Sequence, residues 1–145
     1  MINNTGITMD PWTEITQLTG YPVPLKVKSA CTGPRIVIIP AGRILHAAGP
    51  AGKPTMVWGA FEEMDAEWYS RGNQLDPSWY TPPGTAPVPI YEYYITLTKP
   101  TPAVMSKVAD QPGAATRIGP PKFQFYNPSG FGPPLQGRLL GKWKP

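Results

Sequence analysis

One loop of this chain combines polar residues suited to chemistry with small residues that leave room for a ligand. It spans Gln111–Arg117 and reads Gln-Pro-Gly-Ala-Ala-Thr-Arg. Small residues let the backbone approach a ligand closely. The candidate site residues of the loop are Gln111, Gly113, Thr116 and Arg117. Asp110, directly before it, is the only acidic residue from Thr98 onward, among seven Lys and Arg. The loop is therefore a candidate site for an anionic ligand, and the alternative is an ordinary turn between two elements.

Three residues elsewhere could contribute to such a site, and each also has a purely structural interpretation. His46, the only histidine, ends a predicted strand before a Gly/Pro loop, where it could hydrogen-bond a ribose or a phosphate. Arg71 could hold a phosphate through its guanidinium, or simply complement the dipole of the helix that it ends. Trp58 could stack on a base, although its spacing from Phe61 and Met64 is typical of a core face.

The sequence lacks the motifs of several common enzyme classes. No GxGxxG, Walker loop, HExxH, GxSxG or paired-cysteine motif is present. The single cysteine, Cys31, cannot form an internal disulfide and is interpreted as a small buried hydrophobe. With one cysteine and one histidine available, we expect no metal site.

The charge distribution narrows the possible partners. The net charge is +4, but Gly59–Asp76 carries five acidic residues and one Arg, whereas the basic excess lies in the C-terminal half. Two poles of opposite sign suit an anionic ligand at one end and a matched protein elsewhere; solvated surface is the alternative. The basic residues are scattered, so we expect no nucleic acid. We also expect no membrane insertion, because no apolar stretch approaches the ~18 residues needed, and no signal peptide is visible.

Length and hydrophobic pattern predict one α+β domain over residues 1–145, with a small, strongly bent antiparallel or mixed sheet, or a split barrel, and two or three short helices. Alternating or β-branched residues predict strands at Leu25–Lys28, Arg35–Ile39, Arg43–Ala47, Ile90–Thr98 and Lys122–Tyr126. Caps and apolar spacing predict helices over Asp10–Gly20, Trp58–Arg71 and Thr101–Val108. No element is assigned to the Gly/Pro-rich tail from Asn127.

The order of these features resembles the tuberculosis necrotizing toxin family of NAD glycohydrolases. Four segments carry the resemblance: Pro40–Gly49 (PAGRILHAAG), Phe61–Arg71, Tyr91–Pro102 (YEYYITLTKPTP) and Gln111–Arg117. They are similar to the opening strand of the family, its segment before a Pro-rich loop, its Tyr-rich strand ending in Lys-Pro, and its Gln-Pro-Gly loop. His46 stands where the family has an arginine, unless Arg43 takes that place, and Arg117 stands where the family has a glutamine.

The resemblance implies an ADP-ribosyltransferase-like fold and cleavage of the nicotinamide–ribose bond of NAD+ or NADP+, which is the substrate, so no cofactor is expected. It implies the catalytic residues Gln111, Arg117, Asp110 and His46. It implies the substrate-binding residues Arg43, Arg71, Trp58, Gly113, Thr116 and Gln124. In this scheme Arg71 and Arg117 hold the pyrophosphate, Gln111 or Gln124 positions the ribose or the attacking water, and Asp110 stabilises the oxocarbenium ion.

The family also implies a biological setting. The chain would be a secreted, monomeric antibacterial effector that acts in the cytoplasm of a target cell, and the producing cell would need an immunity protein. Three alternatives stay open. ADP-ribose could be transferred to a protein instead of water. The chain could be a non-enzymatic virion or secretion-apparatus protein, or a module that binds a small ligand without turnover.

Overall fold

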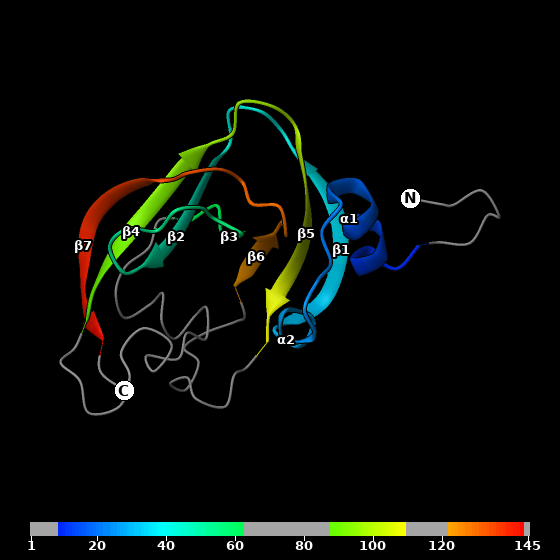
Figure 1. Ribbon diagram of the computed structural model, residues 1–145, viewed down its shortest axis with the longest axis horizontal. Helices are drawn as coiled ribbons and strands as arrows, with labels where there is room; N and C mark the ends of the chain where they lie inside the picture. The colour runs from blue at the N-terminus through cyan, green and yellow to red at the C-terminus, as the bar shows by residue number, and fades with distance from the viewer. Residues whose placement is uncertain (1–8, 63–87, 110–121, 144–145) are drawn as a thin grey trace.

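Two antiparallel sheets and two helices make up the described part of the computed structural model, residues 9–62, 88–109 and 122–143 (Figure 1). The helices are α1 (Pro11–Thr19) and α2 (Leu25–Ser29). The strands are β1 (Cys31–Ile39), β2 (Ile44–Gly49), β3 (Trp58–Gly59), β4 (Val88–Thr96), β5 (Thr101–Val108), β6 (Phe123–Tyr126) and β7 (Leu135–Trp143). The first sheet has the order β1-β5-β6-β3 and the second sheet the order β2-β4-β7. The α+β class with small antiparallel sheets is confirmed, and the narrower ADP-ribosyltransferase-like assignment stays a prediction.

A bent two-stranded ribbon joins the sheets. β1 pairs with β5 in the first sheet, and the same two chain segments continue as β2 and β4, which pair in the second. At the bend, the Gly42 N–H donates to the Leu97 carbonyl at 2.7 Å and the Leu97 N–H donates to the Arg43 carbonyl at 2.9 Å. Gly42 has φ +87°, a conformation that glycine adopts without strain. The bend carries both strands over the top of the molecule in Figure 1.

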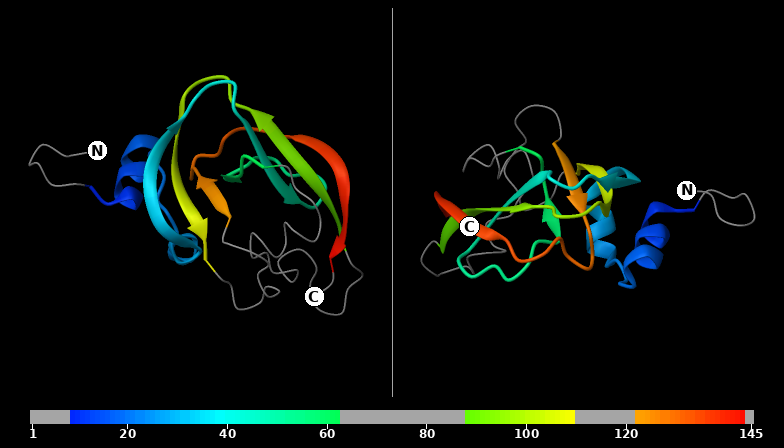
Figure 2. Two further views of the ribbon diagram at one scale, coloured as in Figure 1. Left: turned by 180° about the vertical axis from the view of Figure 1, so that it is seen from behind. Right: turned by 90° about the horizontal axis from the view of Figure 1, so that it is seen from above.

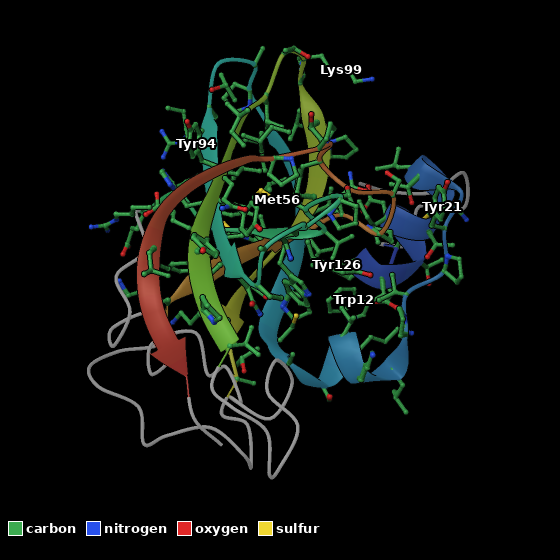
Figure 3. All side chains as sticks on the ribbon, turned by 60° about the vertical axis from the view of Figure 1, so that its left-hand side comes forward. Trp12, Tyr21, Met56, Tyr94, Lys99 and Tyr126 are labelled. Carbon is green, nitrogen blue, oxygen red and sulfur yellow. The ribbon has the colours of Figure 1, made fainter. Side chains whose placement is uncertain are left out.

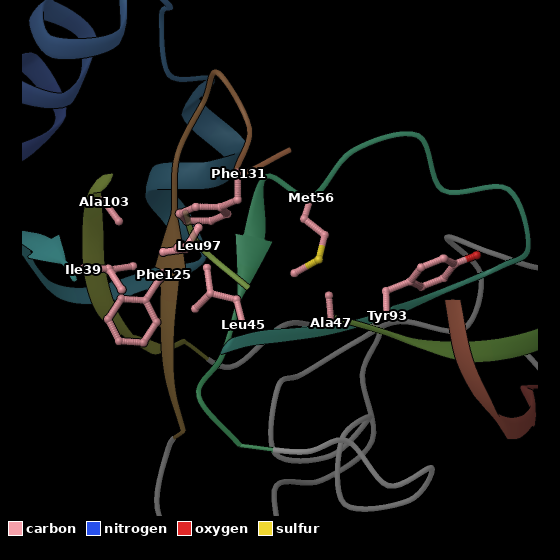
Figure 4. Packing of buried hydrophobic residues seen from close by; sticks show 9 residues of the cluster. All are labelled: Ile39, Leu45, Ala47, Met56, Tyr93, Leu97, Ala103, Phe125 and Phe131. Atoms are coloured by element: carbon pink, nitrogen blue, oxygen red, sulfur yellow. The ribbon is translucent and has the colours of Figure 1, made fainter. Parts of the chain in front are cut away.

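Two apolar cores result, one on each face of the first sheet. The inter-sheet core lies between the two sheets and consists of Ile39, Leu45, Ala47, Met56, Tyr93, Leu97, Ala103, Phe125 and Phe131 (Figure 4). The helix-side core lies between the first sheet and the helices and consists of Trp12, Ile15, Val27, Val104 and Tyr126 (Figure 3). Figure 2 shows the helices against the first sheet, on the side away from the second. Tyr93 of β4 and Leu97, directly after this strand, are buried in the inter-sheet core.

The first helix forms as its caps predict. Asp10 accepts a hydrogen bond from the Trp12 N–H at 3.4 Å, and Pro11 occupies the first helical position. Gly20 ends the helix in the left-handed conformation at φ +77°, with its N–H on the Thr16 carbonyl at 2.8 Å. Ile15 on the inward face is fully buried. Local sequence therefore determines both ends of α1.

Four predictions of secondary structure need correction. Leu25–Lys28 lies in helix α2 instead of a strand, and Val27 is its buried residue. Thr101–Val108 is strand β5 instead of a helix, because β1 and β6 pair with it from either side. Trp58 and Gly59 form β3 and pair with β6, so no helix begins there; residues 63–71 of that predicted helix lie outside the described residues. The tail contains β7, which pairs with β4.

Candidate functional site

A buried carboxylate holds two basic side chains on the second sheet. His46 Nδ1 lies 3.1 Å from Glu92 Oε1, and Arg138 Nε donates to Glu92 Oε2 at 3.2 Å. The side chains of His46 and Glu92 are 12% and 10% exposed, whereas that of Arg138 is 60% exposed. These three residues, the ion cluster, come from three neighbouring strands. The nearly buried carboxylate of Glu92 therefore has two basic partners, His46, which is also nearly buried, and Arg138, which is exposed to solvent.

Strand alternation explains why these side chains meet. His46 pairs with Tyr94 and Ala48 with Glu92, so His46 and Glu92 are diagonal neighbours on one face of the β2–β4 pair. This face is opposite to the one that carries Leu45 and Ala47 into the inter-sheet core. The ion cluster therefore lies on the outward face of the second sheet.

An irregularity in β7 brings Arg138 to the same carboxylate. The β4–β7 register shifts between Tyr91, paired with Leu139, and Tyr93, paired with Gln136. The shift places two residues of β7, Gly137 and Arg138, opposite Glu92, which is the pattern of a β-bulge. A Cβ atom at position 137 would lie 3.3 Å from the Glu92 carbonyl oxygen and 3.5 Å from the Tyr94 ring. Glycine at this position lets the bulged strand pack closely on β4.

The tautomer of His46 follows from its partner. An ionised carboxylate can only accept, so the hydrogen bond to Glu92 places the imidazole proton on Nδ1. In the neutral ring Nε2 is then an acceptor, and among the described residues nothing else hydrogen-bonds to this side chain. A histidine held in this way can take a proton from water or a hydroxyl group, while the carboxylate stabilises the imidazolium that forms.

The chain that follows β3 is hydrogen-bonded to the backbone of this histidine. The His46 N–H donates to the Ala60 carbonyl and the Ala60 N–H to the His46 carbonyl, each at 2.8 Å. Glu62, two residues further on and directly before residue 63, forms an ion pair with Lys122, directly after residue 121. The Val108 N–H donates to the Lys122 carbonyl at 2.9 Å. Residue 62 is therefore two residues from the backbone bridge to His46, and residues 108 and 122 are joined to it through the Glu62–Lys122 ion pair.

Most of the predicted site residues belong to the segments 63–87 and 110–121. Asp110, Gln111, Gly113, Thr116, Arg117 and Arg71 lie outside the described residues. Their roles stay predictions.

The other predicted residues have defined surroundings. The Arg43 guanidinium lies 3.8 Å from the centroid of the Phe61 ring, which in turn stacks on Phe125 at 4.2 Å. The Trp58 ring packs against Tyr126 at 4.6 Å between centroids, and Trp58 is partly buried against the helix-side core. Trp58 therefore packs against a core, but not the core that Phe61 contacts, so the single helical core face expected from their spacing does not form. Arg43 is held at an aromatic pair on the edge of the inter-sheet core.

Gln124 belongs to a polar group around Cys31. Its amide Nε2 donates to the Ala30 carbonyl at 3.0 Å and lies 3.6 Å from Cys31 Sγ and 3.4 Å from Ser106 Oγ. Cys31 is half-buried, and burial raises the pKa of its thiol. A thiol with a raised pKa is a poor nucleophile at neutral pH. The interpretation of Cys31 as a small buried hydrophobe is confirmed only in part, because Cys31 is half-buried against the helix-side core and its Sγ donates to the Val27 carbonyl at 3.3 Å.

Sequence reasoning missed Glu92 and Arg138. The available signal was a single acidic residue within the aromatic run Tyr91–Tyr94, since a carboxylate in a half-buried strand needs a partner. Arg138 gave no signal because β7 itself was not predicted. Among the described residues no group of three or more His, Cys, Asp or Glu is placed to hold a metal ion. No helix in the described ranges is long and apolar enough to cross a bilayer.

Comparisons with known proteins give little further information. No family model matches the chain, and no curated protein matches it. Among solved structures, one described as "Structure of Tse6 in complex with Tsi6" aligns with a TM-score of 0.46 and 14% sequence identity, over 88% of this chain and 98% of that chain. A likeness this weak establishes neither a common fold nor a common activity.

Proposed function

We propose that this chain is an NAD(P)+ glycohydrolase in which His46 and Glu92 form the proton-accepting pair. The observation that carries the proposal is the 3.1 Å contact between His46 Nδ1 and the buried Glu92 carboxylate, which leaves Nε2 as an acceptor. The toxin-family resemblance of Pro40–Gly49 falls on β2 and the bend before it, the segment that carries His46.

The proposed reaction needs only one proton transfer at this site. The bond between ribose C1′ and the nicotinamide nitrogen breaks, and its electron pair leaves with neutral nicotinamide. Water oxygen then bonds to the oxocarbenium-like C1′, and His46 Nε2 takes the proton that the water loses. Glu92 stabilises the imidazolium through Nδ1–H. The general base lowers the barrier only in the transition state, so it acts on kcat more than on KM.

The remaining parts of the proposal come from the toxin resemblance. Asp110 would stabilise the positive charge on the ribose, and Arg71 and Arg117 would hold the pyrophosphate. As an effector, the protein would be monomeric and delivered to the cytoplasm of a target cell, and an immunity protein would inhibit it in the producer.

The test is consumption of NAD+ and NADP+ by purified protein, followed as nicotinamide release. The wild type should release nicotinamide without any other protein, and His46→Gln should lower kcat by about 10²- to 10⁴-fold, the usual share of general base catalysis. Lys28→Met, a change on the exposed face of α2, is the matched control and should keep full activity. Circular dichroism verifies that each variant is folded.

Each outcome of this assay decides between functions. Nicotinamide release only in the presence of a target protein, with ADP-ribose attached to it, would replace hydrolysis by ADP-ribosyl transfer. No consumption of either nucleotide by folded wild-type protein would overturn the enzyme proposal. Equal rates for the wild type and His46→Gln would remove the histidine from the mechanism while keeping the activity.

A further inference from the structure

Lys53 has an unusual position for a lysine. It lies in the loop after β2, between Gly49 and β3, and is half-buried. A Cβ atom at position 49 would lie 3.7 Å from both Cδ and Nζ of Lys53 and 3.9 Å from the Tyr93 ring. The ammonium therefore lies along the strand backbone, on the face of β2 that leads into the inter-sheet core, instead of extending into solvent.

The loop that carries Lys53 is held in place by a buried hydroxyl group. Tyr93 is 2% exposed, and its hydroxyl donates to the Pro50 carbonyl at 2.6 Å. The Lys53 backbone N–H donates to the same hydroxyl at 3.4 Å, and Gln136 Oε1 lies 3.2 Å away. Figure 4 shows the Tyr93 hydroxyl pointing out of the apolar cluster. The start and the end of the segment from Pro50 to Lys53 are thus fixed on β4, and Lys53 is presented from a constrained backbone.

No carboxylate in the described residues compensates this ammonium. Asp10 caps α1, and Glu14 is buried on the same helix. Glu62 pairs with Lys122, and Glu92 is bonded to the two basic members of the ion cluster on the other face of the sheet. Burial lowers the pKa of Lys53, because the ammonium has lost hydration that none of the described carboxylates replaces. A negatively charged ligand beside the Lys53 ammonium would compensate for the hydration that the ammonium loses on folding.

We propose that Lys53 is a binding residue for a phosphate group. The ammonium of lysine binds phosphate as a compact point charge, and the Lys53 side chain packs over Gly49, whose lack of a side chain leaves room for it. The phosphate can belong to a dinucleotide bound at the same domain or to a separate phosphate compound. The chemistry at Lys53 is the same for both, and the site does not depend on glycohydrolase activity.

The direct test is binding of inorganic pyrophosphate to the full chain, measured by titration calorimetry at low ionic strength. Lys53→Met keeps the aliphatic stem against Gly49 and removes the charge, so it should weaken binding at least tenfold. Lys53→Arg keeps the charge and should retain most of the affinity. Lys28→Met removes a charge from the exposed face of α2 and should bind as the wild type does. If Lys53→Met does not fold, the Lys53 side-chain resonances of the wild type should still shift on titration with pyrophosphate.

The outcomes separate the source of the phosphate from the existence of the site. A raised KM for NAD+ in Lys53→Met with unchanged kcat, together with weaker pyrophosphate binding, would identify the dinucleotide as the ligand. Weaker pyrophosphate binding with unchanged kinetics, or in a protein without turnover, would identify a separate phosphate compound. Pyrophosphate affinity equal in Lys53→Met and the wild type, or an equal loss in Lys28→Met, would overturn the proposal.

Discussion

The two sheets of this protein share a ribbon but differ in what covers their outward faces. The first sheet packs apolar side chains on both faces, against the second sheet on one side and against α1 and α2 on the other. The second sheet packs one face into the inter-sheet core and carries the ion cluster on the other. Buried charges do not generally stabilise a fold better than apolar packing does. If the proposed function holds, substitutions in the helix-side core should mainly lower stability, and substitutions in the ion cluster should mainly lower turnover.

The largest expected effect on stability lies on the helix side of the first sheet. Ile15→Ala should lower the free energy of unfolding by about 2–5 kcal/mol, because the side chain is fully buried and its removal leaves a cavity. Leu18→Ala on the same helix, at 46% exposure, should change it by less than about 0.5 kcal/mol. Urea denaturation gives both values. Turnover per folded molecule should be unaffected, and a loss of turnover in Ile15→Ala would contradict the division of roles.

The largest effect on chemistry is expected at the second sheet, in Glu92→Gln. The amide cannot stabilise an imidazolium as a carboxylate does, so kcat for nicotinamide release should fall by about 100-fold, equivalent to ~2.7 kcal/mol in the barrier. KM should stay nearly constant, because Glu92 acts through His46 and not on the ground-state substrate. The matched control is Glu62→Gln, which removes an exposed carboxylate that pairs with Lys122. A change confined to stability, with kcat unaltered, would make Glu92 purely structural.

A medium effect is expected where the chain crosses from β6 to β7. Gly130 has φ +85°, and a Cβ there would lie 2.6 Å from Thr55 Oγ1. Gly130→Ala should cost about 2 kcal/mol, since backbone strain adds to displacement of the Thr55 hydroxyl from its bond to the Gly132 carbonyl. Gly42→Ala, at φ +87° with open space around it, should show the strain alone, about 1 kcal/mol. Equal thermal shifts for the two variants would show that Thr55 moves aside without cost.

A small effect is expected from the exposed member of the ion cluster. Arg138→Met should change stability by only about 0–1 kcal/mol, because a side chain that is 60% exposed gains little from its ion pair. The same denaturation experiment on His46→Gln tests the protected half of the cluster, where loss of the bond to a buried carboxylate should cost more. A larger loss in Arg138→Met than in His46→Gln would reverse this assignment.

The successes and failures of sequence reasoning follow the range of the interactions. The helix over Pro11–Thr19 was predictable because Asp10 and Gly20 cap it locally. The spacing of apolar residues in Thr101–Val108 fits both a helix and a strand, and only pairing with two distant segments selects the strand. The strand Leu135–Trp143 was missed because its glycines and basic residues break the alternation. Its pairing with β4, far away in sequence, makes it a strand.

The residues of the candidate site also differ in whether local sequence or long-range strand pairing determines their positions. His46 was predictable as the only histidine at a strand end. Its partner Glu92 depends on the β2–β4 register, and Arg138 depends on a bulge in a strand that was not predicted. The presence of His46 shows that proton transfer is chemically possible. The partner that sets its tautomer, Glu92, is brought to it only by strand pairing between distant parts of the sequence.

The smallest expected effect concerns the first sheet at alkaline pH and has a definite sign. Burial raises the pKa of the Cys31 thiol above its ordinary value of about 8.5. From about pH 8.5 upward the unfolded chain therefore loses the thiol proton before the native state does. The contribution of the neutral thiol to the free energy of unfolding is therefore fully present below that pH, and it is lost as the pH rises through the pKa of the native state. Cys31→Ala should remove this part of the pH dependence.

The comparison of wild type with Cys31→Ala is needed because two other groups titrate in the same range. Burial also raises the pKa of Tyr126, which acts in the same direction as Cys31, and lowers that of Lys53, which makes stability rise with pH. Lys53 is unaffected by the substitution, so its contribution cancels in the difference. The charge of the Cys31 thiolate also raises the pKa of Tyr126, so the difference includes this coupling, which has the same sign as the Cys31 contribution. Unfolding free energies from pH 7 to pH 10 should show the wild type losing more stability than Cys31→Ala. Parallel curves would mean that the thiol is as well hydrated in the native state as in the unfolded chain, and that this corner of the first sheet is less tightly covered than the rest.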